Sequence, residues 1–169
     1  ISYVRWVLVR KRDEAAPAPA EHVPTTASAV AASDLVLPAG LDFKAYDFAR
    51  AGSTHAFEDY QVGEKIDHVD GMAVEEAEAR MATRPYQNTA KVHFNQDGRA
   101  KGPSGRRLVY GGVVISTART LAFNGLENAG LMLTLNAGRH VNPYFAGATI
   151  FAWSEVLDAQ PVAGRGDVG

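Results

Sequence analysis

The sequence has 169 residues, 46% hydrophobic and 21% charged, which suits a soluble globular protein with one ordinary core. Its 17 basic and 19 acidic residues are mixed along the chain, giving a net charge of -2, and no apolar run reaches the roughly 18 residues that span a bilayer. We therefore expect no nucleic acid, no membrane and a cytoplasmic location, and the lack of cysteine and the scattering of the five histidines predict no metal.

Residues 1–12 are predicted to form one long strand. The stretch "ISYVRWVLVRK" is rich in β-branched and aromatic residues and alternates with period two. Residues 13–55 follow directly and are rich in alanine, proline and small polar residues, which is typical of a linker. A strand that runs straight into a linker has no partner nearby in the sequence. We therefore interpret residues 1–12 as the last strand of a preceding domain, and the chain as a fragment of a longer protein.

A second domain is expected over residues 56–169. Its predicted elements are, in chain order, a strand over 65–69, a helix over 74–87, a mobile loop over 95–107, a helix over 111–124, and strands over 131–141 and 149–159. Gly71 is expected to break the first strand and Pro85 to end or kink the first helix. The second helix is apolar on most sides, which predicts that it is buried.

This order of elements indicates an α+β domain in which an antiparallel sheet wraps one central helix, as in the hot-dog fold. A hot-dog sheet normally has five or more strands, whereas three are predicted after the linker. We therefore expect the rest of this domain to follow Gly169 in a fuller chain. An incomplete sheet also predicts close packing against a second hot-dog half, or a homodimer.

Several segments carry a resemblance to a known family. "FEDYQVGEKI", "RRLVYGGVVIS" and "NPYFAGATI" occur in the order found in the MaoC-like (R)-specific enoyl-CoA hydratases. The longer stretches "LAFNGLENAG", "NAGRHVNPYFAG" and "FAWSEVLD" resemble the double hot-dog branch of that family that acts on mesaconyl-CoA. The resemblance implies reversible hydration of an enoyl-CoA thioester, most narrowly mesaconyl-CoA to β-methylmalyl-CoA. It implies no cofactor, because coenzyme A is part of the substrate.

The resemblance assigns the handling of water to Asn88 and His93. The family motif is D-x-N-P-x-H, and in "QNTAKVHFN" Asn88 takes the aspartate position and His93 the histidine position. An amide cannot accept a proton, so we expect Asn88 to orient the water and His93 to act as the general base. The alternative is that Asn88 only turns the chain after Pro85 and that His93 is a core histidine in a strand "KVHFN".

Tyr110, Gly111 and Gly112 open the second predicted helix. Gly112 aligns with the glycine of the family's HG pair, whereas Gly111 replaces the histidine of that pair. Unsatisfied N–H groups at a helix N-terminus can stabilise the enolate oxygen that forms when water adds to an enoyl thioester. We therefore expect Gly112 to be catalytic and the two residues before it to bind substrate. A tight turn into the helix is the alternative interpretation.

An acyl-CoA substrate carries phosphates, and mesaconyl-CoA carries a free carboxylate as well, so basic side chains must meet both. The candidates are Arg84, Lys91, Lys101, Arg106, Arg107 and Arg139. Each of them taken alone is more often a solvated surface charge, and the sequence does not rank them.

Two other functions stay open. A hot-dog thioesterase would place a carboxylate on or near the central helix, but "GGVVISTARTLAFNGLEN" has none before Glu127. A non-catalytic acyl-CoA-binding or scaffolding half would have an eroded site, and Asn88 would be the sign of that erosion.

Overall fold

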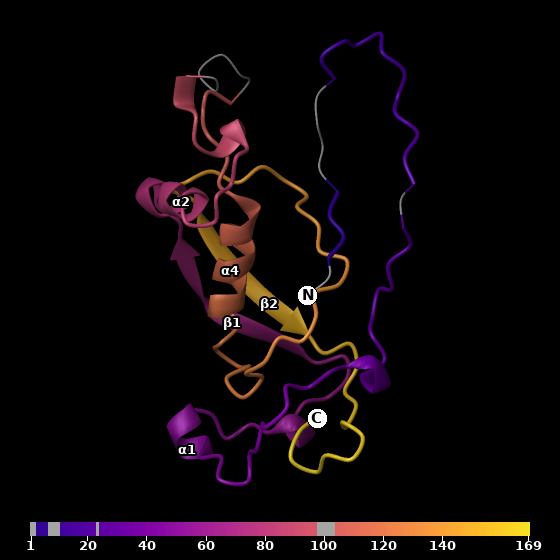
Figure 1. Cartoon of the computed structure of the whole chain (residues 1–169). Helices are drawn as coiled ribbons and strands as arrows, with labels where there is room; N and C mark the ends of the chain where they lie inside the picture. Colours follow the sequence, from indigo (N-terminus) through magenta and orange to yellow (C-terminus); the bar gives the residue numbers. More distant parts are fainter. Residues whose placement is uncertain (1–2, 7–10, 23, 98–103) are drawn as a thin grey trace.

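The computed structural model describes residues 3–6, 11–22, 24–97 and 104–169 (Figure 1). Within these ranges the elements are, in chain order, the 3-10 helix η1 (Ala32–Asp34), α1 (Phe48–Ala51), η2 (Phe57–Asp59), β1 (Lys65–Ala73), α2 (Glu76–Thr83), η3 (Lys91–His93), α4 (Gly111–Leu121) and β2 (Thr149–Glu155). None of these helices is long and apolar enough to cross a bilayer.

Strands β1 and β2 pair antiparallel, with Lys65 opposite Glu155 and Ala73 opposite Thr149. The prediction that Gly71 ends the first strand is wrong, because β1 continues past it to Ala73. The register shifts between Asp67 and Gly71, so an irregularity absorbs the extra residues. The Phe151 ring covers the glycine from the opposite strand, since a Cβ built on Gly71 would lie 2.6 Å from Phe151 Cε1. A cross-strand aromatic of this kind keeps a glycine within a sheet.

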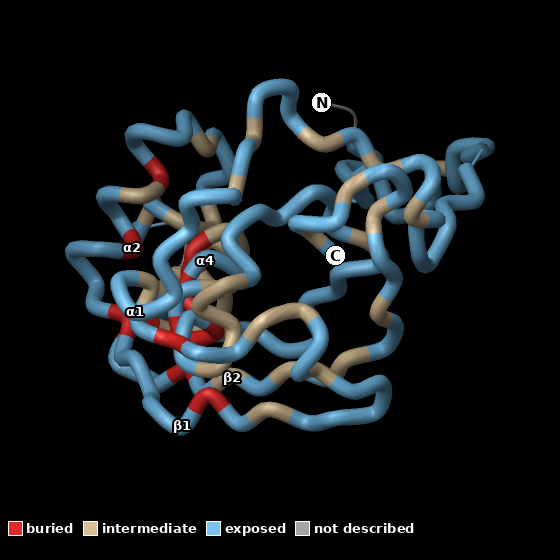
Figure 2. The backbone as a smooth tube through the Cα atoms, turned by 90° about the horizontal axis from the view of Figure 1, so that it is seen from below, coloured by how far each residue is buried: buried red, intermediate tan, exposed pale blue. Residues whose placement is uncertain are grey.

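Helix α4 lies across one face of this two-stranded sheet (Figure 1). Its buried positions are Val113, Thr117 and Leu121, which are four residues apart and therefore share one face. This face contributes to the core cluster that contains Val74 and Ile150, and Figure 2 shows the buried positions gathered around α4 and the strands.

The prediction that α4 is buried on most sides is wrong for the described chain. Ile115, on another face of the helix, is 40% exposed. The reason is geometric: two strands cover one stripe of a helix, and no further described strand covers the rest.

Helix α2 is shorter than the predicted helix over 74–87. It begins after Glu75, whose backbone N–H donates to the Glu78 carboxylate at 3.4 Å, and it ends before Pro85, as the sequence predicts. Val74 lies outside the helix and is completely buried in the core.

The strand predicted over 131–141 is wrong, because these residues have no regular structure. Leu131 and Leu135 are 50% and 63% exposed. Alternating apolar residues form a strand only where a neighbouring strand pairs with them, and no described residue does so here.

The first twelve residues are covered only in part. Residues 3–6 have no strand assignment, while 7–10 lie outside the described residues, so the strand and the linker boundaries stay predictions. Apart from η1, the described residues before α1 form no helix or strand, and they extend beside the sheet (Figure 1).

Candidate active site

The imidazole of His93 lies at the start of α4. Its Nδ1 is 3.0 Å from the carbonyl oxygen of Leu108, and its ring contacts the Tyr110 ring edge-on, with centroids 5.7 Å apart. Tyr110 is the N-cap residue of α4. The backbone fixes this arrangement, because Leu108 N donates to Val92 O at 3.1 Å. The structure therefore brings the predicted histidine to the predicted helix start.

The partner of Nδ1 determines what Nε2 of His93 can do. A carbonyl oxygen only accepts hydrogen bonds, so the neutral ring must carry its hydrogen on Nδ1. Nε2 then holds the lone pair, and it has no hydrogen-bond partner among the described residues. The ring is half-buried and belongs to η3, so "KVHFN" is a 3-10 turn and not a core strand. His93 is thus oriented as a proton acceptor.

Asn88 has an additional role in the backbone turn. Its Oδ1 accepts a hydrogen bond from Ala90 N at 3.0 Å, and its own N–H donates to Thr83 O at 2.9 Å. This is the turn after Pro85 that the alternative interpretation expects. Because Oδ1 is engaged by the backbone, the group left for a ligand is the Nδ2 amide, which only donates.

The two glycines that open α4 are covered by rings of this chain. A Cβ on Gly112 would lie 2.6 Å from Cε1 of Tyr110, and a Cβ on Gly111 would collide with the imidazole of His140. Both positions therefore require glycine for packing. His140 had no place in the predicted site. Only its contact with Gly111, across 29 positions of sequence, brings it to the helix start.

A cavity of about 390 Å³ adjoins the end of α2. Its walls combine guanidinium groups, polar groups and one aromatic ring, supplied by Arg80, Thr83, Arg84, Asn88, Phe94 and Arg107. The structure thus brings together Asn88, Arg84 and Arg107 of the predicted site, while His93 is not among the described residues that line the cavity. Arg80 was missed, although its spacing of four residues from Arg84 on a predicted helix places both on one face.

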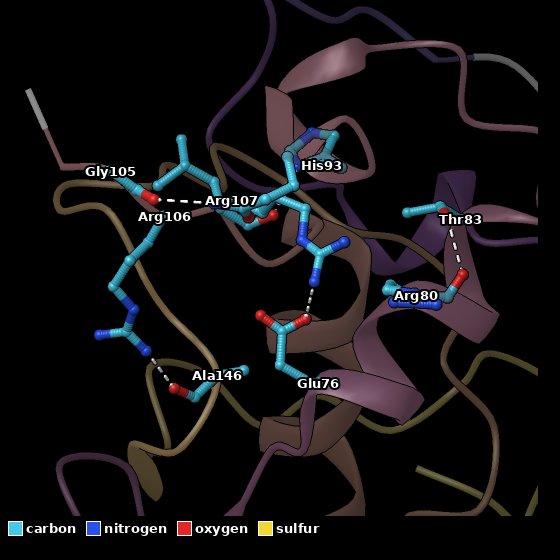
Figure 3. A network of polar contacts seen from close by, with 10 residues as sticks. Glu76, Arg80, Thr83, His93, Gly105, Arg106, Arg107 and Ala146 are labelled. Carbon is cyan, nitrogen blue, oxygen red and sulfur yellow. Dashed lines mark hydrogen bonds and ion pairs between the residues drawn. The ribbon is translucent and has the colours of Figure 1, made fainter. Parts of the chain in front are cut away.

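The predicted basic residues have different surroundings. Arg107 forms an ion pair with Glu76 at 2.6 Å, and its side chain is only 15% exposed (Figure 3). Arg106 turns the other way, donates to the carbonyl oxygen of Ala146 and lies 4.9 Å from the centroid of the Phe145 ring.

Lys91 and Arg139 are exposed, and Lys101 lies outside the described residues.

His68 is a polar residue that the sequence interpretation overlooked. Its side chain is completely buried, with Nδ1 at 2.7 Å from the carbonyl oxygen of Asn124 and Nε2 at 2.8 Å from Ser154 Oγ. It joins β1 to β2 and to the segment after α4. The alternation of the strand over 65–69 places it on the inward face with Ile66, which was the available signal. Because it is sealed from solvent, His68 holds the fold together.

Glu127, the acid considered for a thioesterase, lies beyond the C-terminal end of α4, whereas His93 lies at its start. The pKa of Glu127 is lowered, chiefly because its own backbone N–H binds the carboxylate, and also by hydrogen bonds from Gly125 and Ser53 and by the charge of His55. This carboxylate therefore belongs to a separate polar cluster.

The chain is similar to known proteins along its whole length, although no family model matches it. It is 63% identical over 166 residues to the mesaconyl-CoA hydratase of Cereibacter sphaeroides. The aligned region covers 98% of this chain and 48% of that protein. It is 54% identical over 169 residues to the β-methylmalyl-CoA dehydratase of Chloroflexus aurantiacus, covering 100% of this chain and 48% of that protein. A crystal structure of a MaoC domain protein dehydratase from Chloroflexus aurantiacus matches with a TM-score of 0.86 and 54% identity, over 93% of this chain and 45% of that one. The chain is thus similar over nearly its whole length to a MaoC domain dehydratase.

That structural match also confirms the α+β hot-dog fold. A regulatory protein of monoamine oxidase from Archaeoglobus fulgius, at 23% identity and a TM-score of 0.51, shares the fold over 60% of this chain and 70% of that one. The chain spans about half the length of the curated relatives it matches.

Proposed function

We propose that this chain contributes the active site of an enoyl-CoA hydratase that converts mesaconyl-CoA reversibly to β-methylmalyl-CoA. The observation that carries the proposal is the orientation of His93. Its Nδ1 donates to Leu108 O, which leaves Nε2 as an acceptor beside the first residues of α4. Support for the substrate comes from the names of the two relatives, at 63% and 54% identity.

In this mechanism, His93 Nε2 accepts a proton from water while the water oxygen attacks the β-carbon of the enoyl thioester. The electron pair of the carbon–carbon double bond shifts to join the α-carbon to the carbonyl carbon, and the carbonyl pair moves onto the carbonyl oxygen of the thioester, forming an enolate. His93 then returns the proton to the α-carbon, and the thioester carbonyl re-forms. Asn88 donates from Nδ2 to the water oxygen, because its own oxygen is held by Ala90 N. The protein's groups suffice for these steps, so no cofactor takes part.

The enolate oxygen is assigned to the N-terminus of α4. The first N–H groups of a helix lack intrahelical partners and carry the positive end of its dipole. No side chain caps this terminus among the described residues. Tyr110 and His140 lie against Gly112 and Gly111, so these rings would border the thioester and limit access of bulk water.

A second candidate is a non-catalytic acyl-CoA-binding half of a double hot-dog protein. The observation that favours it is the use of Asn88 Oδ1 in a turn, since a residue fixed by the backbone needs no catalytic role. A thioesterase has less support, because α4 has no Asp or Glu and Glu127 belongs to another cluster. Under either candidate, the exposed Ile115 side of α4 favours packing against a second hot-dog half or a homodimer.

The test is the hydration of mesaconyl-CoA by the intact protein, followed as the loss of enoyl-thioester absorbance. His93→Ala should lower kcat by about 10² to 10⁴, the usual contribution of a positioned general base. His22→Ala, which removes an exposed histidine outside the site, is the matched control. Turnover by His93→Ala within about tenfold of the wild type would contradict the mechanism. An inactive but ligand-binding wild type would instead support the non-catalytic half.

A further inference from the structure

Three arginine side chains meet at the cavity of about 390 Å³ beside α2. Arg80 lies in the last turn of α2, Arg84 is its C-cap residue, and Arg107 comes from the segment just before α4. Arg80 and Arg84 are four residues apart, where like charges on a helix repel each other. The C-terminal end of the helix dipole offsets part of that repulsion. A third guanidinium at the same cavity adds to it.

The cavity has an excess of positive charge. None of its described lining residues is an acid. Glu76 pairs with Arg107 at 2.6 Å from outside the lining, so one carboxylate stands against three guanidinium groups. Arg80 and Arg84 are exposed to solvent, and the excess of positive charge favours an anionic ligand.

Arg107 shows an unmet hydrogen-bonding demand. Its Nε is buried and has no hydrogen-bond partner among the described residues, while Nη2 is held by Glu76 (Figure 3). Buried polar atoms in native proteins are nearly always bonded, and an unbonded one suggests a missing ligand, ion or water. The ion pair with Glu76 also holds the guanidinium in place before any ligand arrives.

We propose that this cavity binds an oxyanion of the acyl-thioester substrate, namely the free carboxylate of a dicarboxylic enoyl group. This inference rests on the proposed function. Planar guanidinium groups match a carboxylate or a phosphate, and the cavity size lies in the range of about 300 to 1,000 Å³ usual for ligand pockets. Phe94 supplies an apolar wall for the carbon chain.

The position of Asn88 distinguishes the carboxylate from the phosphates of coenzyme A. Asn88 lines the same cavity and, in the proposed mechanism, faces the reacting carbons. In a butenedioyl group such as the mesaconyl group, the second carboxylate is attached directly to the β-carbon. The phosphates lie at the far end of the pantetheine arm. Because Asn88 lines this cavity and the proposed mechanism places it at the water that attacks the β-carbon, a group attached to that carbon lies nearer the cavity than the phosphates do, which favours the carboxylate.

The experiment compares two substrates on Arg80→Gln, Arg84→Gln and the double variant of the whole protein. Mesaconyl-CoA carries the free carboxylate, whereas crotonyl-CoA lacks it. Each substitution removes one charge-assisted pair, so kcat/KM for mesaconyl-CoA should fall by about ten- to a hundredfold through KM, while that for crotonyl-CoA stays within about threefold. Arg107 is left intact, because its loss would strand the Glu76 carboxylate.

Arg50→Gln is the matched control. Arg50 lies on α1 with a side chain 90% exposed, and its ion pair with Asp47 spans 3.5 Å. This variant should leave kcat/KM unchanged for both substrates. Thermal unfolding of all variants checks that the fold survives. Equal losses on both substrates would assign the cavity to a phosphate of coenzyme A and overturn the carboxylate assignment. Unchanged kinetics on both would overturn the anion site altogether.

Equilibrium binding separates this inference from the proposed function. Succinyl-CoA and butyryl-CoA have no double bond to hydrate and differ in the free carboxylate. Calorimetry should show tighter binding of succinyl-CoA by the wild type and no such preference in the double variant. If the wild type gave that result but had no hydratase activity, carboxylate binding at the cavity would be supported and the proposed reaction contradicted. Equal affinities for both ligands in the wild type would contradict carboxylate binding at the cavity. The proposed hydration would still be tested separately by the activity of His93→Ala.

Discussion

Removal of the His68 side chain should destabilise the protein without touching the proposed site. His68 is completely buried and bridges three segments through hydrogen bonds of 2.7 Å to Asn124 O and 2.8 Å to Ser154 Oγ. Both partners belong to residues that are not fully buried, so the loss of each bond should cost about 1 kcal/mol, the low end for a polar group left unpaired. The cavity left by the ring adds about 2 to 3 kcal/mol.

For His68→Ala we therefore expect the free energy of unfolding to fall by about 4 to 5 kcal/mol. In a chain of this size, that corresponds to a decrease in Tm of roughly 8 to 20 °C. Urea denaturation gives the free energy from the midpoint at constant slope. Ser154→Ala, which removes one of the two bonds and no ring, should cost about 1 kcal/mol. A loss below about 1 kcal/mol for His68→Ala would refute the view that this histidine holds β1, β2 and the segment after α4 together.

Two further predictions concern Glu127 and the start of α4. The pKa of Glu127 lies below its ordinary value of 4.5, so its stabilising effect is present above that pH and is lost as the pH falls through the lowered value. The wild type should therefore be more stable than Glu127→Gln at neutral pH by a margin that shrinks on acidification below pH 4.5, and a margin independent of pH in denaturant titrations would contradict this. Gly112→Val should abolish mesaconyl-CoA hydration while largely preserving the circular dichroism spectrum, because its side chain meets the Tyr110 ring at 2.6 Å from Cβ. Wild-type turnover would remove the oxyanion role.

Local signals predicted the elements whose partners lie in this chain. The strand at 149–159, the helix at 111–124 and the helix end before Pro85 follow from periodicity and backbone chemistry, and all three occur. The strand at 131–141 shows the same alternation but has no partner among the described residues. Gly71 stays in β1 because of Phe151, a residue 80 positions away in the sequence. The periodicity of the sequence predicts neither the missing partner of residues 131–141 nor the place of Gly71 in β1, because both depend on tertiary pairing.

The sequence named candidate site residues but could not give the orientation of their atoms. The resemblance pointed to Asn88 and His93, and the spacing of Arg80 from Arg84 was readable from the helix. The hydrogen of the neutral His93 ring is placed on Nδ1 by Leu108 O, fifteen residues away. Asn88 Oδ1 is engaged by a turn that closes at Ala90, which leaves Nδ2 for a ligand. Hydrogen-bond partners of this kind are set by the folded backbone, so the chemistry of each side chain emerged only with the structure.

The replacement of a carboxylate by an amide changes how a water molecule would be held, and need not end the reaction. A water molecule both donates and accepts, so it can be fixed between one acceptor and one donor. In the proposed mechanism, His93 Nε2 would supply the acceptor and Asn88 Nδ2 the donor, because Leu108 O and Ala90 N occupy the opposite atoms of the two side chains. In the proposed mechanism, an amide at position 88 leaves proton transfer to the imidazole alone, so we expect that a substitution of His93 is not rescued by its neighbour in the motif.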